Sequence, residues 1–316
     1  MIPSILTIDP WVEPELFAPL LPGMRVSRAT LPVADDACVA VITATDVPFA
    51  ASDAAGLPGL KTVVTASVGY DHLDIAGLAA LGVATFCAPA YCSDEVADHA
   101  LASVLALWRG IPRMDSGRRA GVWDSAGISG LRRIAGSTLG VVGLGRIGRG
   151  LAQRARALEI QVLGYDPFVG GEAIRACGAM PVSLDELLAA SDAVSLHLPL
   201  TDATSPLIGA RELALMPPSG VLVNVSRAGL VDLDALSEAL RAGRLAGAAF
   251  DVWDVEPPMA GDARVEAPNL MLSPHIAWAS DRAKGALVAA VVAAVEAGLA
   301  GQDLVGRLGG PRVTGA

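Results

Sequence analysis

The chain has 316 residues, of which 53% are hydrophobic, and a formal net charge of −10. This length suits two domains or one large one with a sizeable core, and the high apolar content excludes a disordered protein. The negative charge argues against a nucleic-acid surface, so no nucleic-acid partner is expected. Uninterrupted apolar runs stay short of the ~20 residues of a membrane-spanning helix, so no membrane partner is expected.

The N-terminal segment and the cysteines both favour a cytoplasmic protein. The segment MIPSILTIDPWVEPELF carries acids early and no basic n-region, which is not typical of a secretory signal. The four cysteines are scattered and form no Cys-x-x-Cys pair, which favours reduced thiols and predicts neither a disulfide framework nor a metal site. They are Cys38, Cys87, Cys92 and Cys177.

In the first part of the chain, short β-rich runs alternate with loops and short helical stretches, which predicts an α/β unit with a mainly parallel sheet. The pattern changes to one long helix over Ser93–Ile111, with an N-cap serine, acids in the first turn and apolar residues at helical spacing. Gly110, Pro112 and Gly117 are expected to break it. The predicted strands are Ser4–Ile8, Val39–Thr43, Thr62–Thr65 and Ala84–Cys87.

The second part, from GSTLGVV onward, shows a cleaner alternation of strands and helices. A second long helix is predicted after Asp281, and it leads the chain back to the first part. We therefore expect one α/β domain over residues 96–283, inserted between residues 1–95 and 284–316 of another. After the run Leu139, Val141 and Val142, the predicted strands are Gln161–Tyr165, Ala193–Leu196, Val221–Val225, Ala246–Phe250 and Asn269–Leu272.

The stretch VVGLGRIG has the spacing Gly143-x-Gly145-x-x-Gly148 between a predicted strand and a predicted helix. In such a loop the first glycine permits a tight turn, the second lets the backbone approach a pyrophosphate, and the third lets helix and strand pack closely. The free N–H groups at the start of the helix would bind the phosphates. On the pattern alone, an ordinary tight turn of an α/β protein stays open as an alternative.

Asp166 ends the next predicted strand, in QVLGYD, 18 residues after Gly148. An acid at about this offset binds the adenosine ribose hydroxyls, although an acid before Pro167 is also a common turn residue. Strand, glycine loop, helix, strand and acid in this order predict a dinucleotide site. Because an acid repels a 2′-phosphate, we expect the cofactor to be NAD, with NADH preferred over NADPH.

Three further stretches lie at the ends of predicted strands, namely LVNVSRAGLVD, AAFDVWDVEPP and LSPHIAW. Since ligands bind at the carboxyl ends of strands in open α/β sheets, Arg227, Asp251, Glu256 and His275 are expected to converge. Arginine can hold a carboxylate and polarise a carbonyl, and histidine can transfer a proton near neutral pH. An acid on the other ring nitrogen would fix the tautomer and keep the ring protonated at higher pH.

Each of these residues also has an ordinary structural interpretation. Arg227 alone could be a solvated loop cation, Glu256 a surface acid, Asp251 a helix cap, and His275 a core histidine bonded to a carbonyl. Their joint placement after separate strands favours the reduction of 2-oxo acids instead.

Taken together, these motifs resemble the D-isomer-specific 2-hydroxyacid dehydrogenase family, which includes phosphoglycerate, formate and phosphite dehydrogenases and the C-terminal-binding-protein corepressors. SVGYDHLDI resembles the substrate-carboxylate loop, and CAPAYCSDEVADHALA resembles the segment that leads into the interdomain helix. GSTLGVVGLGRIG, LHLPLTDAT, LVNVSRAGLVD, FDVWDVEPP and SPHIAW follow in family order over nearly the whole chain. HIAW and AYCSDEVAD are most similar to the C-terminal-binding-protein-like branch.

The resemblance implies an α/β fold with two Rossmann-like domains and parallel sheets, in which the NAD-binding domain is inserted into a flavodoxin-like substrate domain. It also implies a homodimer that acts on a small 2-oxo or 2-hydroxy acid. By position, Arg227, Glu256 and His275 would be catalytic, with His275 as the general acid for reduction and Glu256 as its partner. The N–H groups of Val68 and Gly69 would bind the substrate carboxylate.

Trp278 is interpreted either as core packing or as a wall of the substrate pocket. Beyond the three glycines and Asp166 of the motif, the resemblance implies the other residues at the cofactor, and the full set is Gly143, Gly145, Arg146, Ile147, Gly148, Asp166, His197, Leu198, Pro199, Thr204, Val225, Ser226, Arg227, Asp251 and His275.

Two other functions stay open. An NAD(H)-sensing, corepressor-like protein without significant turnover would bind the cofactor alone, although the complete Arg–Glu–His set argues against it. A phosphite or formate dehydrogenase would want added cationic groups in the carboxylate loop, and TASVGYDHLD has no lysine or arginine.

Overall fold

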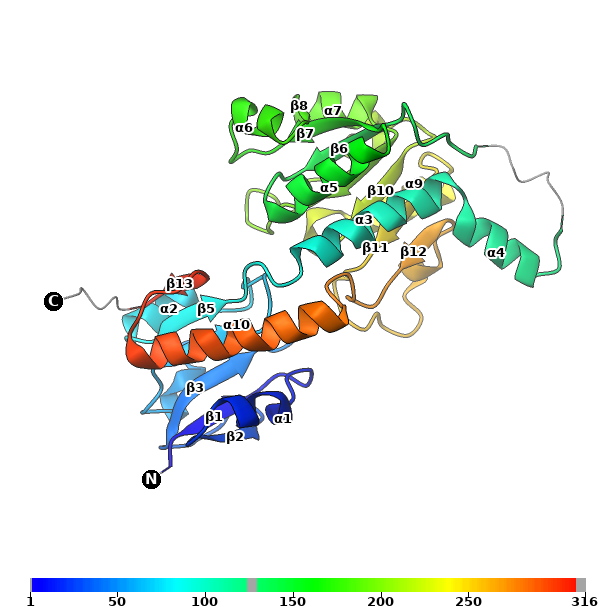
Figure 1. Cartoon of the computed structure of the whole chain (residues 1–316). Coiled ribbons are helices and arrows are strands. Elements are labelled where there is room, and N and C mark those ends of the chain that lie inside the picture. The colour runs from blue at the N-terminus through cyan, green and yellow to red at the C-terminus, as the bar shows by residue number, and fades with distance from the viewer. Residues whose placement is uncertain (1, 124–129, 311–316) are drawn as a thin grey trace. The chain divides into compact units, whose positions relative to one another are not determined.

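The computed structural model describes residues 2–123 and 130–310, which form two compact units (Figure 1). The first unit comprises the described residues of Met1–Cys92 and Ser280–Ala316, and the second is Ser93–Ala279. The boundaries expected from the sequence, after residues 95 and 283, lie a few residues further along the chain. Residues 311–316 of the predicted substrate domain lie outside the described residues.

The first unit is built on a six-stranded sheet with the order β13-β5-β4-β3-β1-β2. The order β2-β1-β3-β4-β5 is that of doubly wound, flavodoxin-like folds, as predicted. The sequence pattern does not predict the edge strands β2 and β13, because β2 is largely exposed and β13 is very short and antiparallel. The strands are β1 (Ser4–Thr7), β2 (Arg25–Arg28), β3 (Cys38–Thr43), β4 (Thr62–Thr65), β5 (Ala84–Cys87) and β13 (Arg307–Gly309).

Helix α10 (Asp281–Ala300) is long and apolar enough, by length and composition, to cross a membrane, although charged residues interrupt its apolar run. It packs on β3, β4 and β5 of its own unit. Val291, Ala294 and Val295 on this face belong to the core of that unit. Such packing is typical of the core helix of a globular domain. The other helical elements of the unit are α1 (Pro14–Phe17), η1 (Ala18–Leu20), η2 (Asp53–Gly56) and α2 (Ile75–Ala80).

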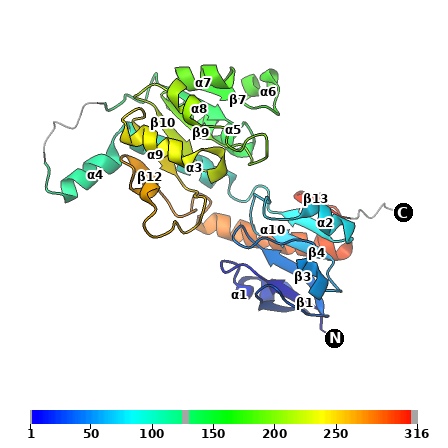
Figure 2. The same cartoon turned by 180° about the vertical axis from the view of Figure 1, so that it is seen from behind.

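The second unit, which Figure 2 shows from behind, holds a seven-stranded, fully parallel sheet. The strand order is β8-β7-β6-β9-β10-β11-β12. This is the Rossmann order 3-2-1-4-5-6 with one further strand, so the predicted fold class is confirmed. The order reverses between β6 and β9, where such sheets bind ligands at their carboxyl edge. The strands are β6 (Thr138–Val142), β7 (Gln161–Tyr165), β8 (Met180–Pro181), β9 (Ala193–Leu196), β10 (Val221–Asn224), β11 (Gly247–Phe250) and β12 (Leu270–Leu272).

Two helical layers cover this sheet. Apolar residues of α3 and α5 form one core with the strands, and those of α7, α8 and α9 form another. The helical elements are α3 (Ser93–Trp108), α4 (Ile111–Arg119), α5 (Arg146–Ala157), α6 (Gly171–Ala176), α7 (Leu184–Ala190), α8 (Ala210–Leu215), η4 (Ala228–Leu230), α9 (Leu233–Arg241) and η5 (Ala263–Glu266).

The predicted helix over Ser93–Ile111 ends earlier than expected, at Trp108. Gly110 breaks it with a left-handed backbone (φ 62°), and α4 then begins. The prediction that Pro112 and Gly117 break a helix is wrong, because both lie within α4. Pro112 is in the first turn, where its missing N–H removes no intrahelical hydrogen bond.

Candidate active site

The glycine loop joins β6 to α5 and has the backbone that a pyrophosphate-binding turn needs. Gly143 has φ 96°, and a Cβ on it would lie 2.7 Å from the carbonyl carbon of His197. A Cβ on Gly148 would lie 2.0 Å from the carbonyl oxygen of Gly143, so α5 packs too closely for a side chain. Around Gly145 nothing lies within 4 Å of an added Cβ. The backbone is therefore open to a ligand at the glycine where a pyrophosphate would approach.

Asp166 follows β7 and is held beside this loop. Its carboxylate accepts hydrogen bonds from the N–H of Leu144 at 2.7 Å and of Phe168 at 2.8 Å. Each carboxylate oxygen keeps a further acceptor site for a ribose hydroxyl. Arg146 and Ile147 begin α5, whose first N–H groups have no acceptor within the helix. These residues fit the adenosine and pyrophosphate of a dinucleotide.

His197 follows β9, next to the glycine loop, and is neutral. Its Nε2 lies 2.8 Å from Ser195 Oγ, and its buried Nδ1 has no hydrogen-bond partner among the described residues. Burial lowers the pKa of His197 to about 3. The His197 ring therefore does not titrate near neutral pH. In the turn that follows His197, Thr204 Oγ1 donates to the carbonyl of Pro199 at 2.9 Å.

Arg227 lies in the loop after β10, and Asn224 holds that loop. The buried Asn224 amide accepts from the N–H of Ser226 at 3.0 Å and donates to the carbonyl of Arg227 at 2.8 Å. Ser226 Oγ donates to the carbonyl of Leu198 at 2.6 Å, which joins this loop, with Val225, to the turn after β9. Asn224 was not predicted from the sequence, although a polar amide at the end of an apolar predicted strand is a signal that could have found it.

Asp251 follows β11 and is almost fully buried. Its Oδ1 accepts from Ser273 Oγ at 2.5 Å, and Ser273 Oγ lies 3.1 Å from Nε2 of His99. Asp251 therefore holds the segment after β12 through side-chain contacts. The roles of Ser273 and His99 in this network were not predicted from the sequence, because their partners are distant in the chain.

His275 and Glu256 form the central pair of the site. Nδ1 of His275 lies 2.7 Å from Oε2 of Glu256, and the N–H of Trp253 donates to Oε1 of Glu256 at 2.7 Å. The hydrogen bond that His275 donates to Glu256 raises the pKa of His275 above its usual value, although burial opposes this rise. Burial raises the pKa of Glu256, but the hydrogen bonds from His275 and Trp253 outweigh it and lower the pKa. Both shifts favour the charged forms of the pair, imidazolium and carboxylate.

The charge of Arg227 acts on both members of this pair. It lowers the pKa of Glu256 and opposes the rise in the pKa of His275, in both cases as the smallest of the causes. The structure thus brings Arg227, Glu256 and His275 into one electrostatic field at the carboxyl edge of the second sheet. An arginine beside an acid–histidine pair can bind an anion and transfer a proton.

The remaining predicted residues lie at the ends of other segments. Val68 and Gly69 follow β4 in the first unit, where Ser67 Oγ donates to the carbonyl of Gly69 at 2.6 Å. Their backbone N–H groups donate no hydrogen bond within residues 2–123 and 130–310. Trp278 is half-buried near the end of the second unit, and both interpretations of it stay open.

Comparison with known proteins agrees with the nucleotide-binding fold of the second unit. Residues 101–277 match the family model described as D-isomer specific 2-hydroxyacid dehydrogenase, NAD binding domain. Glycerate dehydrogenase of Methylorubrum extorquens is 38% identical over 263 residues, which cover 81% of each chain. D-3-phosphoglycerate dehydrogenase of Archaeoglobus fulgidus is 39% identical over 225 residues, which are 71% of this chain and 42% of that protein. The chain thus spans less than half the length of that relative.

Among solved structures, D-lactate dehydrogenase from Aquifex aeolicus complexed with NAD and lactic acid is similar with a TM-score of 0.87. The two sequences are 27% identical, and the match covers 98% of this chain and 99% of that one. The family model and the relatives agree with the resemblance seen in the motifs. The chain belongs to the D-isomer-specific 2-hydroxyacid dehydrogenase family and carries its NAD-binding domain.

Proposed function

We propose that the protein is an NAD-dependent oxidoreductase that interconverts a 2-oxo acid and a D-2-hydroxy acid. The observation that carries this proposal is the 2.7 Å contact between His275 Nδ1 and Glu256 Oε2, on the sheet that also bears the glycine loop. The contact occupies one ring nitrogen and leaves Nε2 for proton transfer. It also raises the pKa of His275, so that the ring is charged over more of the physiological range.

The residues of the site have complementary roles in this reaction. Bound NADH would supply the hydride that reduces C2 of the 2-oxo acid. Protonated His275 gives its Nε2 proton to the developing alkoxide, and Glu256 stabilises the imidazolium before the transfer. Arg227 binds the substrate carboxylate and polarises the carbonyl. In the reverse direction, neutral His275 takes the proton from the substrate hydroxyl.

NADH is the proposed cofactor, in preference to NADPH. The open backbone at Gly145 and the start of α5 would hold the pyrophosphate. Asp166 would accept hydrogen bonds from the adenosine ribose, and its charge would repel a 2′-phosphate. The loops after β9, β10 and β11 would line the rest of the cofactor site, with the residues predicted from the sequence. The Nδ1 of His197, which has no partner in the described part of the chain, is consistent with a ligand there.

A small 2-oxo acid is the proposed substrate, with a homodimer in the cytoplasm as the working form. The N–H groups of Val68 and Gly69, which donate to no other described residue, support carboxylate binding by that loop, because backbone N–H groups are suitable donors to an anion. The relatives are named for glycerate, 3-phosphoglycerate and glyoxylate, all of which carry a carboxylate. Membership of the C-terminal-binding-protein-like branch stays a prediction from the motifs.

The test is oxidation of NADH, followed by its absorbance, with a panel of 2-oxo acids from glyoxylate and pyruvate to phenylpyruvate. NADPH is run in parallel, and NAD with phosphite or formate is included. We expect turnover with NADH, reduced roughly 10²–10⁴-fold in His275→Gln. Binding of NADH without turnover of any member would contradict the proposal and favour a sensing protein. Full turnover in His275→Gln would contradict the role of the histidine.

A further inference from the structure

Glu256 lies in the long segment between β11 and β12, residues 251–269. Its surroundings, residues 254–261, are exposed and belong to no helix or strand. Yet the pair with His275 requires the Glu256 carboxylate to keep one position. Its other oxygen accepts from the N–H of Trp253, so the position of Glu256 depends on what holds Trp253.

Trp253 is anchored in the core and by a carboxylate. Its side chain is buried and packs edge-on to Phe250, with ring centroids 6.3 Å apart. Its indole Nε1 donates to Oδ2 of Asp262 at 3.0 Å. Asp262 lies on the far side of the exposed stretch, so this bond ties the start of the segment to its later part.

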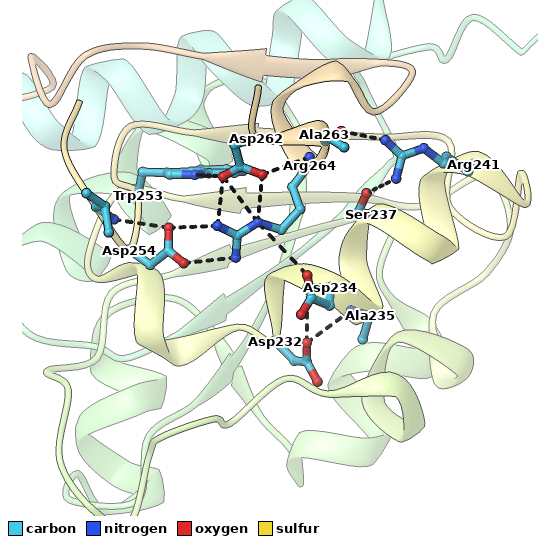
Figure 3. A network of polar contacts seen from close by, with 11 residues as sticks. Asp232, Asp234, Ala235, Ser237, Arg241, Trp253, Asp254, Asp262, Ala263 and Arg264 are labelled. Carbon is cyan, nitrogen blue, oxygen red and sulfur yellow. Dashed lines mark hydrogen bonds and ion pairs between the residues drawn. The ribbon is translucent and has the colours of Figure 1, made fainter. Parts of the chain in front are cut away.

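Arg264 completes this connection (Figure 3). Its guanidinium donates to both oxygens of Asp262, at 2.7 and 2.9 Å, and to both oxygens of Asp254, at 2.8 and 3.2 Å. It also lies over the Trp253 ring, 5.7 Å from the centroid. Hydrogen bonds from Arg264 and then from Trp253 lower the pKa of Asp262, so the carboxylate stays charged at neutral pH.

These four residues, Trp253, Asp254, Asp262 and Arg264, form what we name the Arg264 clamp. Only about a quarter of the Arg264 side chain and 8% of the Asp262 side chain are exposed. Forked, charge-assisted hydrogen bonds in such surroundings are stronger and more directional than those of a single exposed ion pair. The clamp therefore joins Trp253 and Asp254, at the start of the exposed stretch that carries Glu256, to Asp262 and Arg264 just beyond its end.

We propose that the Arg264 clamp is a positioning device for catalysis, which holds the Trp253 N–H so that Glu256 stays aligned with Nδ1 of His275. This inference rests on the proposed function, in which His275 transfers the proton. Arg264 acts through Glu256 and is a positioning residue. Without the clamp, the exposed stretch gains freedom, and the Glu256–His275 contact is made for a smaller fraction of the time.

Three variants separate the parts of the clamp. Arg264→Gln removes the charge and the fork. Arg264→Lys keeps the charge but loses the planar fork that binds two carboxylates. Trp253→Phe removes the indole N–H to Asp262, together with the five-membered part of the ring, and keeps a phenyl ring and the backbone N–H to Glu256. The matched control is Arg211→Gln, because Arg211 makes a forked pair with Asp185, at 2.9 Å to each oxygen, between α7 and α8.

The main readout is the titration of His275 by NMR on the full chain with labelled histidine. The chain has four histidines, and the signal lost in His275→Gln assigns the one of interest. In Arg264→Gln we expect the pKa of His275 to fall toward its usual value. We expect kcat for reduction to fall about tenfold, below the roughly hundredfold that a misplacement of about 1 Å can cause. The KM for NADH should not change.

Trp253→Phe should also lower the pKa of His275, but by less than Arg264→Gln does. In Arg264→Lys the pKa of His275 should lie between its values in Arg264→Gln and in the parent protein. Arg211→Gln should titrate like the parent. A folded Arg264→Gln protein with an unchanged His275 titration would overturn the inference, as would an equal shift in Arg211→Gln. If Arg264→Gln does not fold, an unchanged titration in Trp253→Phe would overturn it instead. If the parent turns over no 2-oxo acid, the proposed function fails, and the titration still decides whether the clamp positions Glu256.

Discussion

The carboxylate of Asp251 and the backbone of Ala277, 26 residues apart, are joined by a hydrogen bond of 2.8 Å. The same carboxylate accepts from the N–H of Ile276 at 3.0 Å, and the carbonyl of Asp251 accepts from the N–H of His275 at 2.9 Å. His275 has φ 52°, in the left-handed region that a residue with a side chain rarely adopts. Asp251 thus holds the turn that presents the histidine.

Asp251→Asn should weaken this turn. The carboxylate only accepts hydrogen bonds, whereas an amide must place an NH₂ group against one of the donors. We expect the free energy of unfolding, measured in urea, to fall by roughly 2–3 kcal/mol. Turnover should fall with it. Ser273→Ala removes one donor and leaves both backbone bonds, so it should have the smaller effect. An Asp251→Asn protein as stable as its parent would contradict this view of the turn.

The pH dependence of the two directions should be opposite. Reduction needs protonated His275, so kcat/KM for reduction should fall as the pH rises through the raised pKa of His275. Oxidation needs the neutral ring, so its kcat/KM should rise through the same pKa. In Glu256→Gln the cause of the raised pKa is removed. The fall of kcat/KM for reduction and the rise of kcat/KM for oxidation, which we call the two limbs, should therefore both move to lower pH. Limbs that stay in place in this variant would show that another group titrates.

The two glycines that flank the start of α5 should respond differently to alanine. Gly145→Ala puts a methyl group into open space, so the melting temperature should stay the same while NADH binds more weakly. Gly148→Ala forces a Cβ against the carbonyl of Gly143 and should destabilise the fold itself. Thermal unfolding and NADH fluorescence titration measure the two effects. Unchanged NADH affinity in Gly145→Ala would argue against a pyrophosphate at this loop.

Asp166 should decide between the two nicotinamide cofactors. In Asp166→Ser the charge that repels a 2′-phosphate is removed, so the ratio of kcat/KM for NADH to that for NADPH should fall by about tenfold or more. Because Asp166 also accepts from Leu144 and Phe168, NADH affinity itself should fall. Both cofactors are measured on the same substrate. A ratio equal to that of the parent would show that another residue sets the preference.

Arg227 should not be replaceable by lysine. In Arg227→Gln, loss of a forked contact to the substrate carboxylate should raise KM, and loss of carbonyl polarisation should lower kcat. Arg227→Lys restores the charge without the fork, so we expect only partial recovery of KM. Removing this positive charge should also raise the pKa of His275 slightly, since Arg227 lowers it. A lysine variant with the kinetics of the parent would contradict forked binding.

Much of the fold could be predicted because its signals are local. The strands Thr62–Thr65, Gln161–Tyr165 and Ala193–Leu196 have the predicted bounds, since each is a short β-rich run between turn residues. The glycine loop follows from its spacing together with the strand before it, the helix after it and the acid that ends the next strand. The exposed edge strand β2 and the start of α4 at Ile111 did not follow, because edge pairing and the helix break at Gly110 depend on neighbours that the local pattern does not contain.

By itself, the sequence determined the fold class, the order along the chain of the strands that carry the site, and the residue types at the ends of these strands. Periodicity, glycine spacing and order along the chain are properties of neighbouring residues. Only the tertiary structure decided which side chains touch. That Glu256 meets His275, that Asn224 holds the Arg227 loop and that Arg264 ties Trp253 to Asp262 depend on loop conformation and side-chain direction. Those are set by packing between segments far apart in the chain, where spacing carries no information.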